Sequence, residues 1–171
     1  MIVAVLLIVL AGCSSEPARR DAESSSAFSA ITGWVGKSIL LTDPGHAGFR
    51  ARYDTVRVDE NLTGMIRSLS PGVEVLVFYG PWCSDSRKQV PVFMRIAESA
   101  GISDERIRYY ALDRSKTSRD GLTDRYAIEL VPTFVFLRGG KEIGRVVESP
   151  RTTLEGDIVA LLVAAGQKGE L

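Results

Sequence analysis

The residues from Val73 to Tyr79 form an apolar run that only Glu74 interrupts, and this run constrains the fold more than any other feature of the chain. Such a run is typical of a central strand that other elements cover on both faces. Ser70-Pro71-Gly72 predicts a turn before the strand, and Ser84 to Ala100 carry apolar side chains at helical spacing behind it. The sequence therefore predicts a buried strand that leads into a helix, as in an α/β domain.

The remaining elements alternate between strands and helices. Asp59 is the expected N-cap of a helix that ends at Ser70-Pro71-Gly72, and Gly139-Gly140 is the expected turn of a hairpin. Further strands are expected over residues 50–58, 107–112, 133–137 and 142–147, and further helices over residues 122–126 and 152–165. This order implies one mixed central sheet with helices on both faces.

The first thirteen residues, MIVAVLLIVLAGC, differ from the rest of the chain. Their apolar run is about ten residues long, which is too short for a bilayer core of roughly 30 Å and fits the hydrophobic region of a secretory signal, although no Lys or Arg precedes it. Leu10-Ala11-Gly12-Cys13 resembles the lipobox of bacterial lipoproteins. The resemblance implies that residues 1–12 are a lipoprotein signal peptide. It also implies that lipidated Cys13 anchors the chain to a membrane of the cell envelope, facing the periplasm if there are two membranes.

Two further segments precede the regular part of the chain. Residues 14–26 contain no large apolar side chain, so we interpret 13–26 as a flexible tether from Cys13. Phe28, Trp34 and Val35 recur at helical spacing, and Asp43-Pro44-Gly45 marks a turn. We therefore interpret residues 27–48 as an N-terminal extension that packs on a domain spanning residues 49–171.

Cys83 is the candidate reactive group, because lipidation of Cys13 would leave it as the single free thiol. It follows Trp82 at the start of the predicted helix, where unpaired N–H groups and the positive end of the helix dipole favour thiolate over thiol. Arg87 and Lys88 strengthen this effect if they point toward the sulfur, whereas Asp85 opposes it. The alternative is a buried, inert cysteine that behaves as a small hydrophobic residue.

The combination of Trp82-Cys83, Pro91 and Val131-Pro132-Thr133 before a hairpin resembles the thioredoxin superfamily over residues 50–168. The strings WCSDSRKQVPVF and VPTFVF are most similar to bacterial exported, membrane-tethered thioredoxin-like proteins. The resemblance implies a thioredoxin fold in which Pro132 is cis and lies beside Cys83. It also implies that Val131 pairs with an extended client segment and that Trp82, Pro132 and Thr133 complete the substrate surface.

The sequence departs from the family pattern at two places. Ser86 stands where dithiol members have a second cysteine, and Val77 stands where they carry a buried acid, six residues before the reactive cysteine. Cys83 would then act as a monothiol nucleophile in disulfide reduction or isomerisation, with Ser86 as a catalytic partner that hydrogen-bonds the thiolate. The expected partners are envelope proteins bearing thiols or disulfides, or small thiols, together with an external resolving thiol.

Two other functions remain open from the sequence. One is a redox-inactive peptide-binding or assembly module on the thioredoxin fold, and the other is a peroxide-sensing thiol that passes through sulfenic acid. Lys plus Arg balances Asp plus Glu at 21 each, so no nucleic-acid partner is expected, and we expect a monomer. His46 is the one histidine and is expected on a surface loop, and the chain offers no cluster of metal ligands and no cofactor motif.

Overall fold

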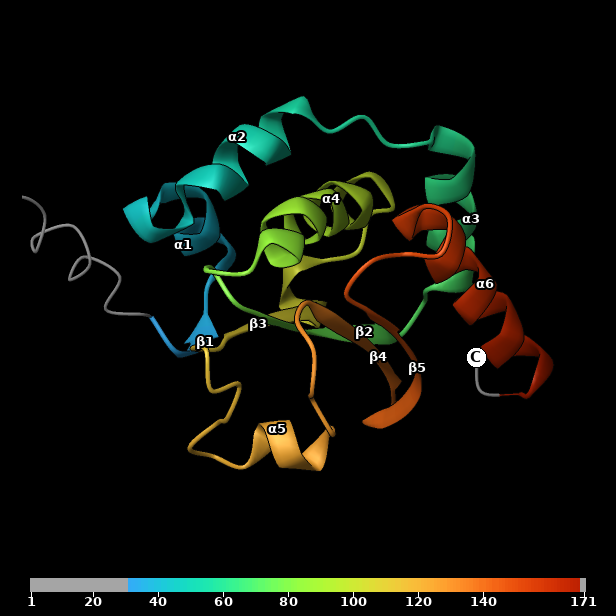
Figure 1. The fold of residues 1–171 in the computed structure, drawn as a ribbon. Helices are drawn as coiled ribbons and strands as arrows, with labels where there is room; N and C mark the ends of the chain where they lie inside the picture. The colour runs from blue at the N-terminus through green and yellow to red at the C-terminus, as the bar shows by residue number, and fades with distance from the viewer. Residues whose placement is uncertain (1–30, 170–171) are drawn as a thin grey trace, which may run out of the picture.

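The structure is a computed structural model that describes residues 31–169 (Figure 1). The predicted signal peptide, the tether, the lipidation of Cys13 and the place of Phe28 lie outside the described residues. Between residues 31 and 169, no helix is long and apolar enough to cross a membrane.

The described residues form a five-stranded mixed sheet in the order β1-β3-β2-β4-β5. Its strands are β1 (Gly33–Val35), β2 (Val73–Tyr79), β3 (Ile107–Ala111), β4 (Thr133–Arg138) and β5 (Lys141–Val147). The central strand β2 is parallel to β3 and antiparallel to β4, while β1 pairs antiparallel with β3 and β5 with β4. Gly139 and Gly140 form the hairpin turn with φ of 55° and 76°, as the sequence predicted.

Helices cover both faces of the sheet, which confirms the predicted fold class (Figure 1). The α-helices are α1 (Lys37–Thr42), α2 (Ala47–Thr55), α3 (Glu60–Leu69), α4 (Ser84–Ser99), α5 (Leu122–Arg125) and α6 (Leu154–Gln167), and the 3₁₀ helices are η1 (Pro44–His46) and η2 (Asp104–Arg106). In Figure 1, α4 lies on one face of the sheet with α2 beyond it, and the short α5 lies on the other face. Asp59 is the N-cap of α3 as predicted, and its carboxylate accepts the N–H groups of Asn61 and Leu62.

Side chains of β2 alternate between two hydrophobic clusters, one on each face of the sheet. Val75, Val77 and Tyr79 belong to a large cluster with α4 and α6, which we call the main core. Leu76 and Phe78 belong to a smaller cluster that includes Leu112, Ile128 and Val131, which we call the second core. Burial on both faces explains why the apolar run of β2 is almost continuous.

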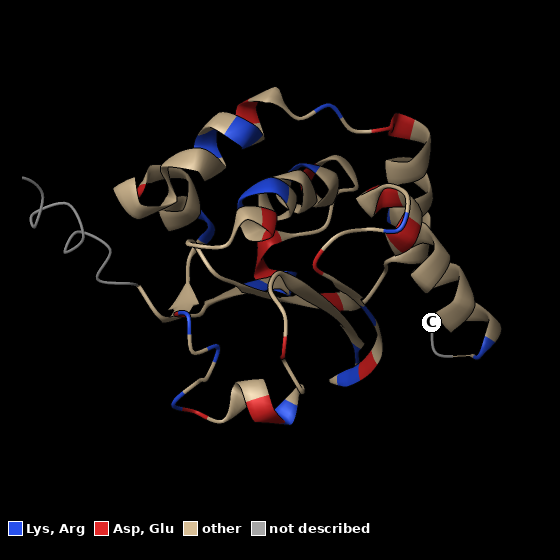
Figure 2. Ribbon diagram, viewed as in Figure 1, with Lys and Arg blue, Asp and Glu red and all other residues tan. Residues whose placement is uncertain are grey.

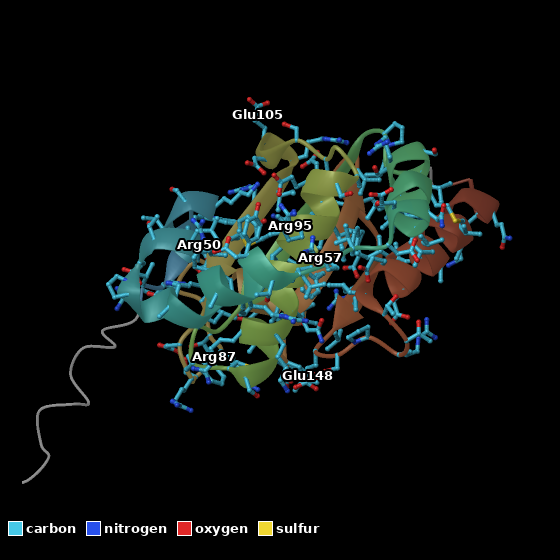
Figure 3. The ribbon with its side chains drawn as sticks, turned by 90° about the horizontal axis from the view of Figure 1, so that it is seen from above. Arg50, Arg57, Arg87, Arg95, Glu105 and Glu148 are labelled. Atoms are coloured by element: carbon cyan, nitrogen blue, oxygen red, sulfur yellow. The ribbon has the colours of Figure 1, made fainter. Side chains whose placement is uncertain are left out.

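The strand expected over residues 50–58 is wrong, because this segment forms most of α2. Phe49, which lies just before the predicted strand, is fully buried, and Tyr53 follows one helical turn later and donates to Glu98 of α4. Figure 3, viewed from above, shows α2 lying across α4, with Arg50 on α2 and Arg95 on α4 labelled. Packing of the Phe49 and Tyr53 face on α4 therefore outweighs the alternating pattern that favoured a strand.

The helical spacing expected around Trp34 and Val35 is also wrong, since both residues lie on β1. Val35 faces the main core, whereas Trp34 points to the opposite face. Trp34 packs edge-on against Tyr110, the residue of β3 with which it pairs. This alternation is that of a strand. Residues 31–48 therefore contribute a strand to the sheet of the domain, and the expected boundary between residues 48 and 49 falls inside α2.

Two buried tyrosines predict how stability depends on alkaline pH. Burial raises the pKa of the Tyr79 and Tyr109 phenols above the ordinary value of about 10. Above that pH the unfolded chain releases both protons while the folded chain keeps them. The free energy of unfolding should therefore be insensitive to these groups below about pH 9 and fall by about 1.4 kcal/mol per pH unit for each tyrosine above pH 10.

Urea unfolding between pH 8 and pH 11 measures this loss, and Tyr109→Phe is the control. In the described part of the chain, the buried Tyr109 hydroxyl has no hydrogen-bond partner, so the variant loses no bond at neutral pH. Above pH 10 the free energy of unfolding of this variant should fall less steeply with pH, by about 1.4 kcal/mol per pH unit, which is the contribution of one tyrosine. A variant with the slope of the unmodified protein would show that Tyr109 ionises in the folded state.

Candidate thiol site

Cys83 is the N-cap of α4, immediately behind the turn that follows β2. Its N–H donates to the Gly80 carbonyl at 2.9 Å and its own carbonyl accepts the Arg87 N–H at 3.1 Å, which fixes the backbone on both sides of the sulfur. The first amides of a helix have no partner within the helix, so the sulfur lies at an end that attracts negative charge. Cys83 is partly exposed, which does not fit the alternative of a buried, inert cysteine.

The sulfur of Cys83 contacts the segment that precedes β4. Its S–H group donates to the Val131 carbonyl at 3.1 Å, and the peptide bond between Val131 and Pro132 is cis. This contact describes the protonated thiol, because a thiolate has no proton to donate. An ionised sulfur would therefore exchange the Val131 carbonyl for the amides at the start of α4.

The side chains of Val131 and Thr133 face inward, whereas the sequence led us to expect a main-chain role for Val131 and a place on the substrate surface for Thr133. Val131 belongs to the second core, and the buried Thr133 hydroxyl donates to the Leu130 carbonyl at 2.7 Å. Pro132 between them is buried as well, and these side chains hold the bend before β4. The neighbouring Leu130 is 40% exposed and forms the apolar surface here, and no sequence pattern pointed to it.

Trp82 is held rigidly beside the thiol. Its indole N–H donates to the Leu112 carbonyl at 2.9 Å, and its ring packs on Gly80 so closely that a Cβ there would lie 2.6 Å from a ring carbon. The Arg114 guanidinium lies 5.1 Å from the ring centroid, in the range of a cation–π contact. The close approach of the half-buried Trp82 ring therefore requires a glycine at position 80.

Ser86 lies beneath the site and is fully buried. Its hydroxyl accepts the Gly80 N–H at 3.2 Å. Among the residues that the structure describes, Ser86 and the Cys83 sulfur form no hydrogen bond, so the hydroxyl joins the helix to the turn instead of contacting the sulfur. Val77, where dithiol members have an acid, is fully buried in the main core and offers no proton.

His46 is buried at 2% exposure, and the expectation that it lies on a surface loop is wrong. Its Nδ1 lies 3.1 Å from an Asp43 carboxylate oxygen and its Nε2 lies 2.9 Å from the Tyr79 hydroxyl. The ring is enclosed by Phe49 and Tyr79, with centroids 5.2 Å and 5.7 Å away. Asp43, three residues earlier in a capped turn, was a local signal for this arrangement, whereas the contact with Tyr79 spans 33 residues.

Charged groups around the site are of both signs. Arg87 and Glu148 are both seen near the N-terminal end of α4 in Figure 3, and the Glu148 N–H donates to the Pro132 carbonyl at 2.7 Å. Lys88 pairs with Asp85 at 3.7 Å. Figure 2 shows acidic and basic residues interspersed over the helices and strands. Among residues 31–169, no three His, Cys, Asp or Glu side chains gather in a way that could hold a metal ion.

Comparison with known proteins identifies the family of this chain. Residues 42–160 match a family model described as Thioredoxin, and this match covers more than half of the chain. The protein therefore belongs to the thioredoxin family, and its sheet and helices form a thioredoxin fold.

Individual relatives are distant. The chain is 28% identical over 90 residues to a thioredoxin-like protein of Acanthamoeba polyphaga mimivirus, covering 53% of this chain and 63% of the relative. It is 28% identical over 86 residues to a thioredoxin of Malassezia sympodialis, covering 50% of this chain and 78% of the relative. Protein disulfide-isomerase A5 of Mus musculus is 34% identical over 80 residues, which are 47% of this chain and 15% of that protein. The chain thus spans less than two thirds of the mimivirus relative and a small part of the isomerase.

Among solved structures, a protein of unknown function from Pseudomonas aeruginosa aligns with a TM-score of 0.58 at 16% identity. The alignment covers 79% of this chain and 94% of the other. At this level of identity the likeness supports the fold alone.

The bond between Ser86 and Gly80 predicts the effect of removing the hydroxyl. Ser86→Ala leaves the Gly80 N–H buried without an acceptor, and this should lower the free energy of unfolding by about 1–3 kcal/mol. Urea unfolding followed by circular dichroism measures the loss. Ser84→Ala is the matched control, because Ser84 is exposed on the same helix, and it should change stability by less than about 0.5 kcal/mol. Equal losses in the two variants would contradict the assigned role of Ser86.

Proposed function

We propose that this protein carries out monothiol thiol–disulfide exchange, with Cys83 as the nucleophile. The observation that carries the proposal is a partly exposed sulfur at the start of α4, held against the carbonyl that precedes Pro132. Partial exposure and a place at the N-terminus of a helix are features of a reactive cysteine. Membership of the thioredoxin family also supports thiol–disulfide exchange as the reaction of this cysteine.

The proposed reaction forms and breaks one S–S bond at each step. The Cys83 thiolate attacks one sulfur of a client disulfide, and the other client sulfur leaves as a thiolate and takes up a proton. In reduction, an external thiol attacks the Cys83 sulfur of the mixed disulfide and releases the reduced client, and a second external thiol then frees Cys83 and leaves as the external disulfide. In isomerisation, a thiol of the client itself attacks the client sulfur of the mixed disulfide, which forms a new client disulfide and frees Cys83. Reduction consumes two electrons from external thiols, whereas isomerisation consumes none.

The place of Ser86 supports external resolution. Residues three apart at a helix start lie about 5–6 Å apart at Cβ, which is the place from which a second cysteine would attack. Here that place holds a buried hydroxyl bonded to Gly80, and a hydroxyl cannot resolve a disulfide. A mixed disulfide with this protein should therefore be long-lived in the absence of free thiols.

For clients, we propose segments that lie along Trp82, Leu130 and the backbone at Val131 and Pro132, on proteins of the cell envelope. A small thiol is the simplest external resolving partner. Lipidation of Cys13 and the tether over residues 13–26 would hold the domain close to the membrane, where newly exported proteins emerge. This localisation rests on the N-terminal sequence pattern.

Introducing the missing thiol tests the proposal. Ser86→Cys should form a disulfide with Cys83 and gain insulin-reducing activity with dithiothreitol as the electron source. The reason is that the introduced thiol can attack the mixed disulfide and release the client. The unmodified protein should instead accumulate a mixed disulfide when it is offered oxidised glutathione. The matched control is the double variant Cys83→Ser with Ser86→Cys, which should do neither.

The Ser86→Cys experiment also distinguishes the redox-inactive binding module, which the apolar Val77 and the Cys83–Val131 contact favour. A variant that forms the disulfide but reduces no insulin, together with an unmodified protein that takes up no glutathione, would establish that module. Capture of an unfolded client by Cys83→Ala as well as by the unmodified protein would then identify peptide binding without exchange.

A further inference from the structure

The chain of hydrogen bonds from Asp43 through His46 to Tyr79 has no part in the exchange proposed above. His46 and Tyr79 are buried and Asp43 is partly exposed, and burying the two polar side chains is costly unless their hydrogen bonds are satisfied. Aliphatic side chains would fill the same space without that cost. All three lie where the segment before α2 meets the end of β2, and this is the end from which the chain turns toward Cys83. Their position therefore points to the thiol site.

For a neutral His46 ring, one arrangement of protons satisfies the three groups. A carboxylate can only accept, so the Nδ1 atom of His46 carries the hydrogen that faces Asp43. In the neutral ring Nε2 is then an acceptor, and the Tyr79 hydroxyl donates to it at 2.9 Å. Asp43 is itself held by the Gly45 N–H at 2.9 Å. The chain of bonds thus runs from the η1 turn to the tyrosine at the last position of β2.

Tyr79 is followed directly by Gly80, and Gly80 carries both bonds that shape the turn to Cys83. Its N–H donates to Ser86 at 3.2 Å and its carbonyl accepts the Cys83 N–H at 2.9 Å. The first turn of α2 also lies close to α4, since a Cβ at Gly48 would lie 3.5 Å from the Arg87 side chain. Displacement of the Tyr79 ring would therefore move the backbone that places the sulfur.

We propose that His46 is a positioning residue for Cys83, and that it acts by holding Tyr79 and through it the Gly80 turn. The inference rests on the proposed function for its biological meaning, because it concerns the same thiol. Its physical content is separate: the reactivity of the Cys83 sulfur in the folded protein depends on the bond between His46 and Tyr79. A bond to Asp43 alone would not suffice.

Two amide substitutions separate the two bonds of the ring. The side-chain amide of glutamine reaches about as far as Nε2 of histidine, whereas that of asparagine reaches about as far as Nδ1. His46→Gln can therefore keep a bond to Tyr79, and His46→Asn can keep only a bond to Asp43. Tyr79→Phe removes the same contact from the other side. Tyr109→Phe is the matched control. It also removes a hydroxyl from the main core, but this hydroxyl has no hydrogen-bond partner among the described residues.

The measurement is the iodoacetamide alkylation rate of Cys83 in the full-length protein, purified in detergent and followed on the Cys83 peptide by mass spectrometry. Because displacement of the sulfur from the amides at the start of α4 would remove their support for the reactive thiolate, we expect His46→Asn and Tyr79→Phe to react roughly 3- to 30-fold more slowly than the unmodified protein. His46→Gln and Tyr109→Phe should stay within about twofold. Rates that do not change in low urea exclude reaction through global unfolding.

A merely structural role would give a different result. All the His46 and Tyr79 variants would then lose stability, yet the alkylation rate of their folded state would equal that of the unmodified protein, and this would overturn the inference. A faster rate in Tyr79→Phe, or equal rates in His46→Gln and His46→Asn, would overturn it as well. Alkylation needs no client, so these outcomes are independent of whether the protein exchanges disulfides.

A second readout uses the fact that His46 is the one histidine of the chain. Its imidazole nitrogens give a single pair of signals in ¹⁵N-resolved spectra of untagged protein, and these report which nitrogen carries the proton. We expect the Nδ1-protonated form in the unmodified protein and a change at Nε2 in Tyr79→Phe. An Nε2-protonated ring in the unmodified protein would contradict the proposed chain of bonds.

Discussion

Burial of β2 on both faces is the constraint on which the rest of the structure depends. Apart from the exposed Glu74, its side chains alternate between the main core and the second core, and none of these buried side chains could become a reactive group without disturbing one of the two cores. Chemistry must therefore lie beyond the strand, where the chain leaves the sheet at Gly80. This explains why the thiol stands at the start of α4 and why the place of a buried acid can be taken by Val77 without loss of packing.

The turn from Gly80 to Cys83 resolves a conflict between close packing and access. Gly80 lets the Trp82 ring approach its backbone, and the ring in turn bonds to the Leu112 carbonyl and closes the second core. Ser86 satisfies the Gly80 amide from below. The result is a rigid backbone that leaves one sulfur partly exposed. Replacement of a second cysteine by serine keeps this scaffold because a hydroxyl accepts the same amide proton.

Signals that lie within a few residues of each other made most of the fold predictable. The apolar run of β2, the cap at Asp59 and the Gly139-Gly140 turn each define an element locally. The segment from Arg50 to Val58 could not be assigned in this way, because its polar and apolar residues alternate while Phe49 and Tyr53 lie one helical turn apart. Which pattern prevails depends on α4, which is distant in the sequence. The inward direction of Thr133 and the exposure of Leu130 likewise depend on tertiary packing.

His46 is the clearest case of this limit and also shows how the site is assembled. In the sequence it lies in a Pro-Gly turn, which favours the surface, and nothing local indicates that Tyr79 will enclose it. In the structure, β1, α1 and η1 bring it against the last residue of β2, so residues that precede the reactive cysteine by nearly forty positions help to define its surroundings. Lys37 and Tyr53 tie the same segment to η2 and α4 through Asp104 and Glu98. The N-terminal segment therefore belongs to the architecture of the thiol site and is more than a cover over the sheet.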